Sequence, residues 1–363
     1  MAEFVPGSTG SEQVLFARDG VLGRVLLNRP RAINSLTREM VVATRAQLQE
    51  WVEDPGIAAV AIEGAGEKGL CAGGDIRAVR EAHLAGTSGG VDFWADEYVL
   101  DAQIAEYDKP VVAVMDGIVM GGGLGVSMFA AARWATPRSK VAMPETKIGF
   151  FPDVAATYRL SRAPGELGTH MALTGTVVDG WDAVELGLAD AVVDPDAVPG
   201  LLADIAAGGP VEAAPSDRSV RLDATPSHRP RRTWDPGDRG GGLTDPGTRA
   251  WIDECYAGDD PAVILERLRS HPDPAANAAA EEISLRSPLS VAVTLEALRR
   301  SRSAVSPREV LATDTVVSGN LLQRPDFVEG VRALLVDKDH RPRWEHPDLA
   351  AVPRTEVLEL FTQ

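Results

Sequence analysis

The chain has 363 residues, 44% of them hydrophobic, so it is long enough to bury a large core and is expected to be globular. Its formal net charge of −17 disfavours nucleic acid as a partner, because the chain as a whole repels a polyanion. Its two cysteines, Cys71 and Cys255, exclude a disulfide framework and a cysteine metal site, and they are typical of a reducing cytoplasm.

The first half of the chain is predicted to alternate strands with helices. Short runs rich in β-branched and apolar residues predict strands at residues 14–16, 21–27, 58–62 and 111–115. The first two are expected to pair as a hairpin, because Asp19-Gly20 between them is a typical turn dipeptide. Thr37 is expected to cap a helix that ends near Trp51. This alternation favours an α/β core.

Two glycine-rich turns follow these strands, one at residues 71–76 and one at residues 121–123. The second precedes an apolar run at residues 124–132, which predicts a buried helix. Bare glycine N–H groups approach a ligand closely, and at the start of a helix they lie at the positive end of its dipole. We therefore expect the N–H groups of Gly74 and Gly122 to bind the oxygen of a reacting carbonyl as an oxyanion hole. The alternative interpretation of the glycine triplet is a turn or a helix-packing contact.

Two acids follow the second glycine turn in an apolar stretch. Glu145 has apolar residues on both sides, which predicts burial, and a buried carboxyl group has a raised pKa and can transfer protons near neutral pH. The alternative is a surface glutamate that pairs with Lys147 or Lys140. Asp153 follows a proline and precedes a helical pattern, so it is either a functional carboxylate or the N-cap of a helix.

The second half of the chain is predicted to be mainly helical after a short strand at residues 191–193. Helical patterns occur at residues 182–188, 249–252, 288–300 and 306–322. Residues 206–248 are rich in glycine, proline, aspartate and arginine without a hydrophobic period, and they are predicted to form an insert or linker. The expected domains are a flexible N-terminus at 1–12, a core with the site at 13–205, this insert, and a C-terminal helical subdomain at 249–363.

Several of these segments resemble a known family, the crotonase or enoyl-CoA hydratase/isomerase superfamily. Residues 27–36 resemble its first CoA-contacting strand and turn, residues 71–76 its first oxyanion turn, and residues 115–123 its second. Residues 142–153 and 326–344 are similar to its 3-hydroxyisobutyryl-CoA hydrolase branch. The resemblance leaves out only the first dozen residues and the predicted insert. It implies an α/β spiral of strand-strand-helix repeats with a C-terminal helical subdomain.

The resemblance also implies a reaction, the hydrolysis of a short 3-hydroxyacyl-CoA thioester. 3-Hydroxyisobutyryl-CoA would be converted to 3-hydroxyisobutyrate and CoA, a step of valine degradation. Gly74 and Gly122 would polarise the thioester carbonyl, and Glu145 would activate water or attack the carbonyl carbon. Asp153 would bind the β-hydroxyl group or position the water. CoA is expected as part of the substrate, with no prosthetic group and no metal, and its expected contacts are Arg29, Arg31, Ala32, Ala72, Ile76 and Arg77.

The chain departs from the hydratases of this superfamily at two positions. Those enzymes carry a catalytic glutamate where this chain has Gly125, and they typically carry glycine where it has Asp153. The missing glutamate counts against the first alternative, an enoyl-CoA hydratase or isomerase of fatty-acid metabolism. The presence of both Glu145 and Asp153 counts against the second alternative, a non-catalytic acyl-CoA-binding scaffold.

The expected partner is therefore the acyl-CoA substrate, and the sequence is compatible with a homo-oligomer. An RNA-binding role, which some relatives in the superfamily have, is disfavoured by the negative charge. The sequence shows no signal-peptide pattern and no apolar run that is long enough to span a bilayer, so we expect no membrane partner. With the two cysteines, this predicts a cytoplasmic location.

Overall fold

The computed structural model describes residues 2–215, 242–243 and 245–362. The chain divides into two compact units, and each unit gathers three separate stretches of sequence. The first contains Met1–Asp75, Ala95–Val141 and Val178–Trp234, and the second contains Ile76–Trp94, Ala142–Val177 and Asp235–Gln363. These units do not coincide with the linear division predicted at residues 205 and 249. Most of the predicted insert at 206–248 lies outside the described residues.

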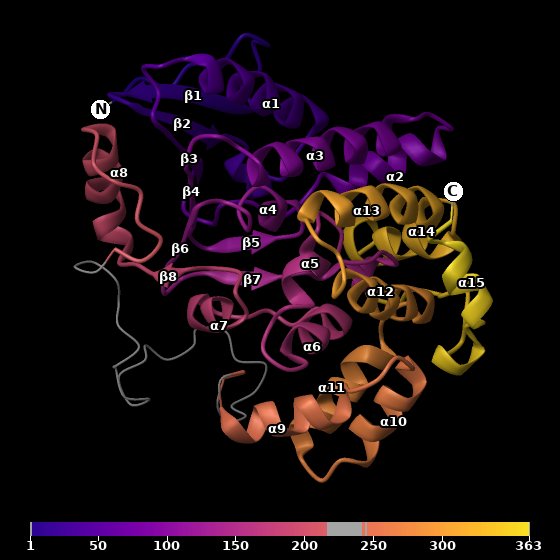
Figure 1. The fold of residues 1–363 in the computed structure, drawn as a ribbon. Helices are drawn as coiled ribbons and strands as arrows, with labels where there is room; N and C mark the ends of the chain where they lie inside the picture. Colours follow the sequence, from indigo (N-terminus) through magenta and orange to yellow (C-terminus); the bar gives the residue numbers. More distant parts are fainter. Residues whose placement is uncertain (1, 216–241, 244, 363) are drawn as a thin grey trace. The chain divides into compact units, whose positions relative to one another are not determined.

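The first unit is built on a six-stranded sheet with the strand order β1-β2-β3-β4-β6-β8 (Figure 1). Its strands are β1 (Val14–Asp19), β2 (Leu22–Leu27), β3 (Ala59–Gly64), β4 (Val111–Met115), β6 (Ala132–Ala135) and β8 (Ala191–Val192). β1 and β2 are antiparallel, with Asp19 opposite Leu22, and every further pair of neighbours is parallel. β5 (Ile118–Met120) and β7 (Lys140–Ala142) form a separate two-stranded sheet.

Among the described residues, the α-helices that lie wholly in the first unit are α1 (Arg38–Glu53), α4 (Gly122–Gly125), α7 (Gly180–Glu185) and α8 (Val198–Ala206). α8 packs on one face of the large sheet. Its residues Leu202 and Ile205 belong to one hydrophobic core with alternate strand residues such as Ala61. The intervening residues Val60 and Ile62 are buried as well. The central strands are therefore buried on both faces, as is usual in a parallel sheet. The two glycine turns follow β3 and β5 at the ends of this rigid framework.

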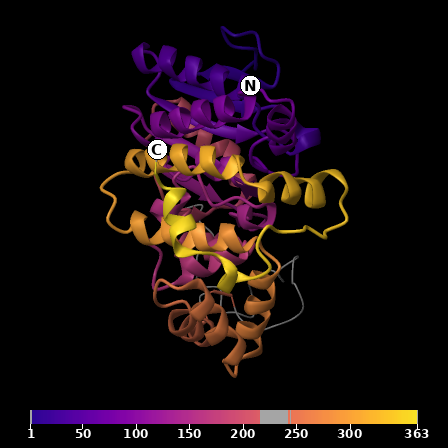
Figure 2. The same ribbon diagram turned by 90° about the vertical axis from the view of Figure 1, so that its right-hand side faces the viewer.

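The second unit is mainly helical, and its C-terminal helices are coloured orange to yellow in Figures 1 and 2. Its helices are α2 (Ile76–Leu84), α5 (Ala156–Leu160), α6 (Leu167–Thr174), α9 (Pro246–Cys255), α10 (Pro261–Ser270), α11 (Pro274–Ser284), α12 (Pro288–Ser301), α13 (Pro307–Leu322), α14 (Pro325–Val331) and α15 (Arg354–Glu359). α3 (Gly89–Ala105) begins in this unit and ends in the first. Short helical turns lie at η1 (Pro30–Ala32), η2 (Glu145–Ile148), η3 (Pro195–Ala197), η5 (Arg332–Val336) and η6 (Leu349–Ala351).

The helix starts of the second unit have a shared local cause. Five helices, α9 to α13, begin with proline directly after an aspartate or serine N-cap. Each N-cap side chain accepts a hydrogen bond from a backbone N–H of the first turn, for example Ser287 from Ser290 N at 3.1 Å. Proline suits the first helical position because its missing N–H has no partner there. These helices are therefore encoded locally.

Most of the predicted elements are confirmed, including the hairpin, the strand at residues 111–115 and the helices at 288–300 and 306–322. Thr37 caps α1, accepting a hydrogen bond of 3.2 Å from Met40 N. The α/β class is confirmed, and the order strand, strand, helix recurs as β1-β2-α1 and β4-β5-α4. No helix in the described residues is both long and apolar enough to cross a membrane.

The predicted buried helix at residues 124–132 is wrong. α4 ends at Gly125, and the chain turns through Ser127 into β6, which starts at Ala132. The Ser127 hydroxyl donates to Gly123 O at 2.6 Å and helps to close this turn. The run is buried almost throughout, as predicted, but a short apolar run does not reveal by its pattern whether it is a helix, a turn or a strand.

Candidate active site

The structure brings the two glycine turns of the first unit together. Cys71 N donates to Ile118 O at 3.1 Å, and Met120 N donates to Cys71 O at 3.0 Å, so the start of the first turn is hydrogen-bonded alongside β5. A Cβ atom added to Gly73 would lie 3.3 Å from Met120 O and 3.8 Å from Gly122 N. A side chain at position 73 would therefore touch the second turn, so the two glycine turns lie side by side, as an oxyanion hole with one donor from each turn requires.

The N–H groups of Gly74 and Gly122 are free to bind a ligand. Leu36 holds the residues on both sides of Gly74, because its N–H donates to Gly73 O and its carbonyl accepts from Asp75 N, both at 2.8 Å. Gly122 is the first residue of α4, where an N–H has no partner within the helix. Among the described residues, neither glycine N–H donates to a backbone carbonyl or a side chain. The predicted donor role of both stays a prediction that this geometry allows.

Two buried acids of α3 lie against these glycines, and neither was predicted from the sequence. Glu97 is 2% exposed and Asp101 is 0% exposed. A Cβ atom on Gly122 would overlap Glu97 Oε1, and a Cβ atom on Gly125 would lie 2.7 Å from Asp101 Oδ1. The available signal was two acids four residues apart within an apolar helix that carries the core residue Trp94. Both glycines are therefore required by the space that these carboxyl groups occupy.

The contact between Gly125 and Asp101 predicts the effect of restoring the hydratase glutamate. Gly125→Glu should lower the free energy of unfolding by about 1 to 3 kcal/mol, because its Cβ would overlap the carboxyl group of Asp101 and a second carboxylate would be buried there. The variant should therefore unfold at a lower temperature. It should not gain hydration of crotonyl-CoA. Calorimetry and the absorbance of the enoyl thioester measure both effects. Gly319→Glu is the matched control, since nothing lies within 4 Å of its Cβ position. Hydration by a variant of unchanged stability would contradict this expectation.

The residues predicted to contact CoA are divided between the two units, and their role stays a prediction. Arg29 in the first unit is already engaged, because its guanidinium binds Asp75 at 3.0 Å and Ser35 O at 2.6 Å. Arg31 and Ala32 are exposed on η1, and Ala72 N donates to Ile33 O at 2.9 Å. Ile76 and Arg77 open α2 in the second unit, where Arg77 donates to Leu335 O. Arg31 is therefore the better phosphate candidate of the first unit.

Glu145 lies in the second unit, at the start of η2. It is 7% exposed, and its Oε2 has no hydrogen-bond partner among the described residues. Burial raises the pKa of this carboxyl group well above its usual range, and repulsion from Asp153 raises it further. The predicted burial is therefore confirmed. Within the part of the chain that the structure describes, Glu145 forms no ion pair with Lys147 or Lys140, and the Lys147 ammonium donates to Gly175 O at 3.0 Å.

Two side chains of η2 bind the end of α6, and Arg286 from the loop between α11 and α12 binds the same end. Thr146 Oγ1 donates to Leu173 O at 3.4 Å, and Lys147 Nζ donates to Gly175 O. Arg286 donates two hydrogen bonds, of 3.0 and 2.9 Å, to the carbonyl of Thr174 between them. The last carbonyls of a helix lack partners within the helix, and cations there are favoured by the helix dipole. This network fixes the backbone on which Glu145 is carried.

Asp153 is 5% exposed and begins a turn with an unusual backbone. Val154 and Ala155 have φ angles of 52° and 57°, so two successive residues other than glycine are left-handed. Each such residue costs on the order of 1 to 3 kcal/mol and persists only where its surroundings hold it. The N-cap interpretation of Asp153 is wrong, because Ala155 occupies the N-cap of α5 and Ala156 N donates to the main-chain oxygen of Asp153 at 2.8 Å.

An aromatic cluster packs around Phe150 and Phe151, which lie on the segment between the two acids. The rings of Trp94 and Phe150 are stacked with centroids 4.7 Å apart, and Phe327 packs edge-on to Trp94 at 5.7 Å. Phe151 is buried beside Phe150, at a centroid distance of 5.2 Å. Trp94 is a buried core residue. Phe150 and Phe151 are buried with the segment that links the two acids, and burial is the first cause of the raised pKa of Glu145.

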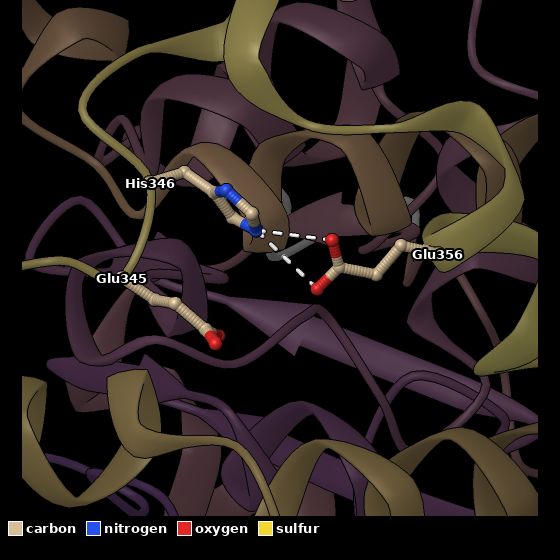
Figure 3. A group of neighbouring side chains, drawn as sticks. All are labelled: Glu345, His346 and Glu356. Atoms are coloured by element: carbon tan, nitrogen blue, oxygen red, sulfur yellow. Dashed lines mark hydrogen bonds and ion pairs between the residues drawn. The ribbon is translucent and has the colours of Figure 1, made fainter.

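A group of two glutamates and one histidine has the composition of a metal site. Figure 3 shows the His346 ring turned toward both carboxylate oxygens of Glu356, at 3.3 and 3.1 Å from Nε2, with Glu345 beside them. Arg324 binds the carboxylates of both glutamates. A guanidinium therefore already supplies the positive charge that a metal ion would bring, and we assign no metal to this cluster.

Comparison with known proteins gives one family and several activities. Residues 22–361 match a family model described as enoyl-CoA hydratase/isomerase. The protein of Rattus norvegicus named 3-hydroxyisobutyryl-CoA hydrolase, mitochondrial, is 36% identical over 353 residues, which cover 97% of this chain and 89% of the relative. The Homo sapiens protein of the same name is 35% identical over 97% of this chain and 89% of the relative.

Two solved structures are similar over nearly the whole chain. One is described as a carnitinyl-CoA dehydratase from Mycobacterium thermoresistibile, with a TM-score of 0.87, 42% identity and 97% of both chains covered. The other is described as an enoyl-CoA hydratase from Rhodobacter sphaeroides 2.4.1, with a TM-score of 0.85, 36% identity and the same coverage. These proteins share the fold, but their names describe different reactions. The residues of the site therefore have to distinguish hydrolysis of a thioester from addition or removal of water.

Proposed function

Because the chain belongs to the enoyl-CoA hydratase/isomerase family, we propose that it hydrolyses a short 3-hydroxyacyl-CoA thioester, with 3-hydroxyisobutyryl-CoA as the substrate. The products are 3-hydroxyisobutyrate and CoA, as in valine degradation. The observation that carries the proposal is the pair of buried, interacting carboxyl groups Glu145 and Asp153 in a chain with glycine at position 125. The relatives named 3-hydroxyisobutyryl-CoA hydrolase, which match nearly the whole chain, support it.

Each group of the site has one task in the proposed reaction. The N–H groups of Gly74 and Gly122 donate to the thioester oxygen and stabilise the negative charge that it gains when a nucleophile adds; one such donor is worth about a hundredfold to a thousandfold in rate. The Glu145 carboxylate takes a proton from water, whose oxygen adds to the carbonyl carbon while the carbon–sulfur bond breaks. The proton then passes to the departing CoA thiolate. In the second form of the reaction Glu145 itself attacks, and water cleaves the mixed anhydride.

Asp153 accounts for the proposed preference for a hydroxylated acyl group. A buried carboxylate accepts a hydrogen bond from the substrate's β-hydroxyl group, and this bond is lost when the acyl chain carries only hydrogen there. Losing one hydrogen bond to a charged group inside a protein costs about 1.5 to 3 kcal/mol, which is on the order of tenfold to a hundredfold in kcat/KM. Isobutyryl-CoA should therefore be a poor substrate.

The names of the two similar structures favour a second candidate, addition of water to an enoyl-CoA double bond or its reversal. In the hydratases of this superfamily that chemistry uses two glutamates. This chain has Gly125 at the position of one of them, and the carboxyl group of Asp101 leaves no room there for a side chain. The single carboxylate Glu145 suffices for hydrolysis, because water supplies the nucleophile and one base activates it.

The deciding experiment measures release of the CoA thiol from 3-hydroxyisobutyryl-CoA, 3-hydroxypropionyl-CoA and isobutyryl-CoA, beside hydration of crotonyl-CoA. We expect thiol release from the two hydroxylated substrates at least about tenfold faster than from isobutyryl-CoA. Asp153→Ala should remove most of this preference. Hydration of crotonyl-CoA without thiol release would instead assign the chain to the hydratases, and equal cleavage of all three thioesters would remove the proposed role of Asp153.

CoA enters this reaction as part of the substrate, and the acyl-CoA thioester is the partner that we propose. The cytoplasmic location also stays a proposal, while the named relatives are described as mitochondrial. Fractionation of the source cells with an antibody to the chain tests it. Self-association is measured by light scattering at assay concentrations.

A further inference from the structure

A third buried carboxyl group lies beside the Asp153 turn in the second unit. Asp314 on α13 is 1% exposed, and its Oδ2 accepts a hydrogen bond of 2.8 Å from Ala155 N. The two residues are 159 positions apart in the sequence, so this contact exists only because α13 packs beside α5. The proposed reaction gives Asp314 no task, although a buried acid is costly to keep.

The conformation of the turn explains why an acceptor is needed at this place. Val154 and Ala155 are both left-handed and both fully buried, and a β-branched residue rarely adopts this backbone. A buried N–H group without an acceptor destabilises the conformation that creates it. Asp314 supplies the acceptor for the second of these residues. The left-handed pair in turn sets the direction in which the chain carries the Asp153 side chain, which directly precedes it.

We propose that Asp314 is a positioning residue, which holds the left-handed turn through the Ala155 N–H and thereby fixes where the Asp153 carboxylate meets the β-hydroxyl group of the substrate. The inference rests on the proposed role of Asp153 and adds the residue that fixes the position of its carboxylate. Electrostatics agree with this proximity. Burial raises the pKa of Asp314 well above its usual range, repulsion from Asp153 adds to this, and the Ala155 N–H opposes it. Asp153 likewise raises the pKa of Glu145, after burial.

Two substitutions separate the hydrogen bond from the charge. Asp314→Asn keeps a carbonyl oxygen for Ala155 N, whereas Asp314→Leu has a similar size and no acceptor. We expect Asp314→Leu to lose about tenfold to a hundredfold in kcat/KM for 3-hydroxyisobutyryl-CoA and much of its preference over isobutyryl-CoA. Asp314→Asn should stay within about threefold of the wild type. Equal losses in both variants would overturn the proposal, since the charge rather than the acceptor would then matter.

A matched control comes from the same helix. Ser318 is buried on α13 one turn after Asp314, and its hydroxyl donates to Thr315 O at 3.3 Å, within the same helix. Ser318→Ala therefore perturbs the packing of α13 and should leave the preference for hydroxylated substrates unchanged. If the control loses that preference as Asp314→Leu does, the effect is general loosening of α13 and the proposal fails.

A double-mutant cycle tests whether Asp314 acts through Asp153. In an Asp153→Ala background, adding Asp314→Leu should cause no further loss of kcat/KM per folded enzyme, because the carboxylate to be positioned is already gone. Losses that multiply would show a separate role and overturn the proposal. Circular dichroism and the fraction of folded enzyme are measured for each variant, so that a folding defect is not counted as a loss of rate.

Hydrogen exchange of the Ala155 amide tests the contact without any substrate. The amide should be protected in the wild type and in Asp314→Asn, and it should exchange at least about tenfold faster in Asp314→Leu. Unchanged protection in Asp314→Leu would overturn the inference even if the thioester is cleaved as proposed. Conversely, a protein that leaves every thioester intact but shows this exchange pattern would refute the proposed function and retain the structural role of Asp314.

Discussion

Glu145→Gln is expected to lower kcat for 3-hydroxyisobutyryl-CoA by on the order of a hundredfold to ten-thousandfold, the usual effect of removing a general base. The amide has nearly the size of the carboxyl group but cannot take the proton of water or form an anhydride. Because the proposed contact of Asp153 with the substrate hydroxyl is kept, KM should change little. Steady-state thiol release gives both constants. A variant that keeps more than about a tenth of kcat would remove Glu145 from the reaction.

The same substitution should make the protein more stable. The pKa of Glu145 is raised in the folded chain, by burial first and then by Asp153, so its contribution to stability is fully present below its usual value of 4.5 and is lost as pH rises through the raised value. Glutamine has no such loss. We therefore expect Glu145→Gln to be more stable than the wild type at pH values above the raised pKa of Glu145, and equally stable below pH 4.5.

Glu296→Gln is the matched control for this pH dependence, because its expected sign is opposite. Partial burial alone would raise the pKa of Glu296, but hydrogen bonds from Arg300 and Arg354 outweigh burial and lower it. Its contribution to stability is therefore present at neutral pH and is lost as pH falls. Thermal unfolding over this pH range should move the two variants in opposite directions. Parallel shifts would mean that the two carboxyl groups do not differ in environment as the structure shows.

Gly122→Ala is expected to lower kcat by about a hundredfold to a thousandfold, the usual cost of losing one oxyanion donor. The new Cβ would overlap Glu97 Oε1 and lie 3.2 Å from Leu36 Cδ1, so the backbone at position 122 has to shift. The N–H group would then no longer point to its present place. A KM change much smaller than the kcat change is expected, because the oxyanion forms only in the transition state.

The control for Gly122→Ala is Gly319→Ala on α13. Nothing lies within 4 Å of the Cβ position at Gly319, so alanine there should be neutral for kcat. It should even stabilise the helix, by about 1 kcal/mol, because alanine has the higher helix propensity. Full activity of a folded Gly122→Ala variant would contradict the donor role of Gly122 and leave the glycine triplet with its packing role alone.

The family and the reaction class were readable from the sequence because the residues that carry them form short contiguous segments. The resemblance at residues 115–123 and 142–153 is confirmed by the family match and by relatives that cover nearly the whole chain. The start of α1 was readable for the same reason, since its cap Thr37 acts on an N–H only three residues away, whereas the N-cap predicted at Asp153 was wrong. The buried helix predicted at 124–132 failed because hydrophobicity reports burial and not, over so short a run, the backbone conformation.

The sequence by itself thus determined part of the local chemistry of this protein: which glycines can present N–H groups, that Glu145 lies in an apolar stretch, and where α1 begins. Only the tertiary structure decided which buried acid meets which partner. Glu97 and Asp101 lie against Gly122 and Gly125, and Asp314 holds the turn after Asp153 across 159 positions of sequence. A carboxyl group has the same letter in the sequence whether it is solvated or buried, and its pKa and its role follow from neighbours that only packing brings together.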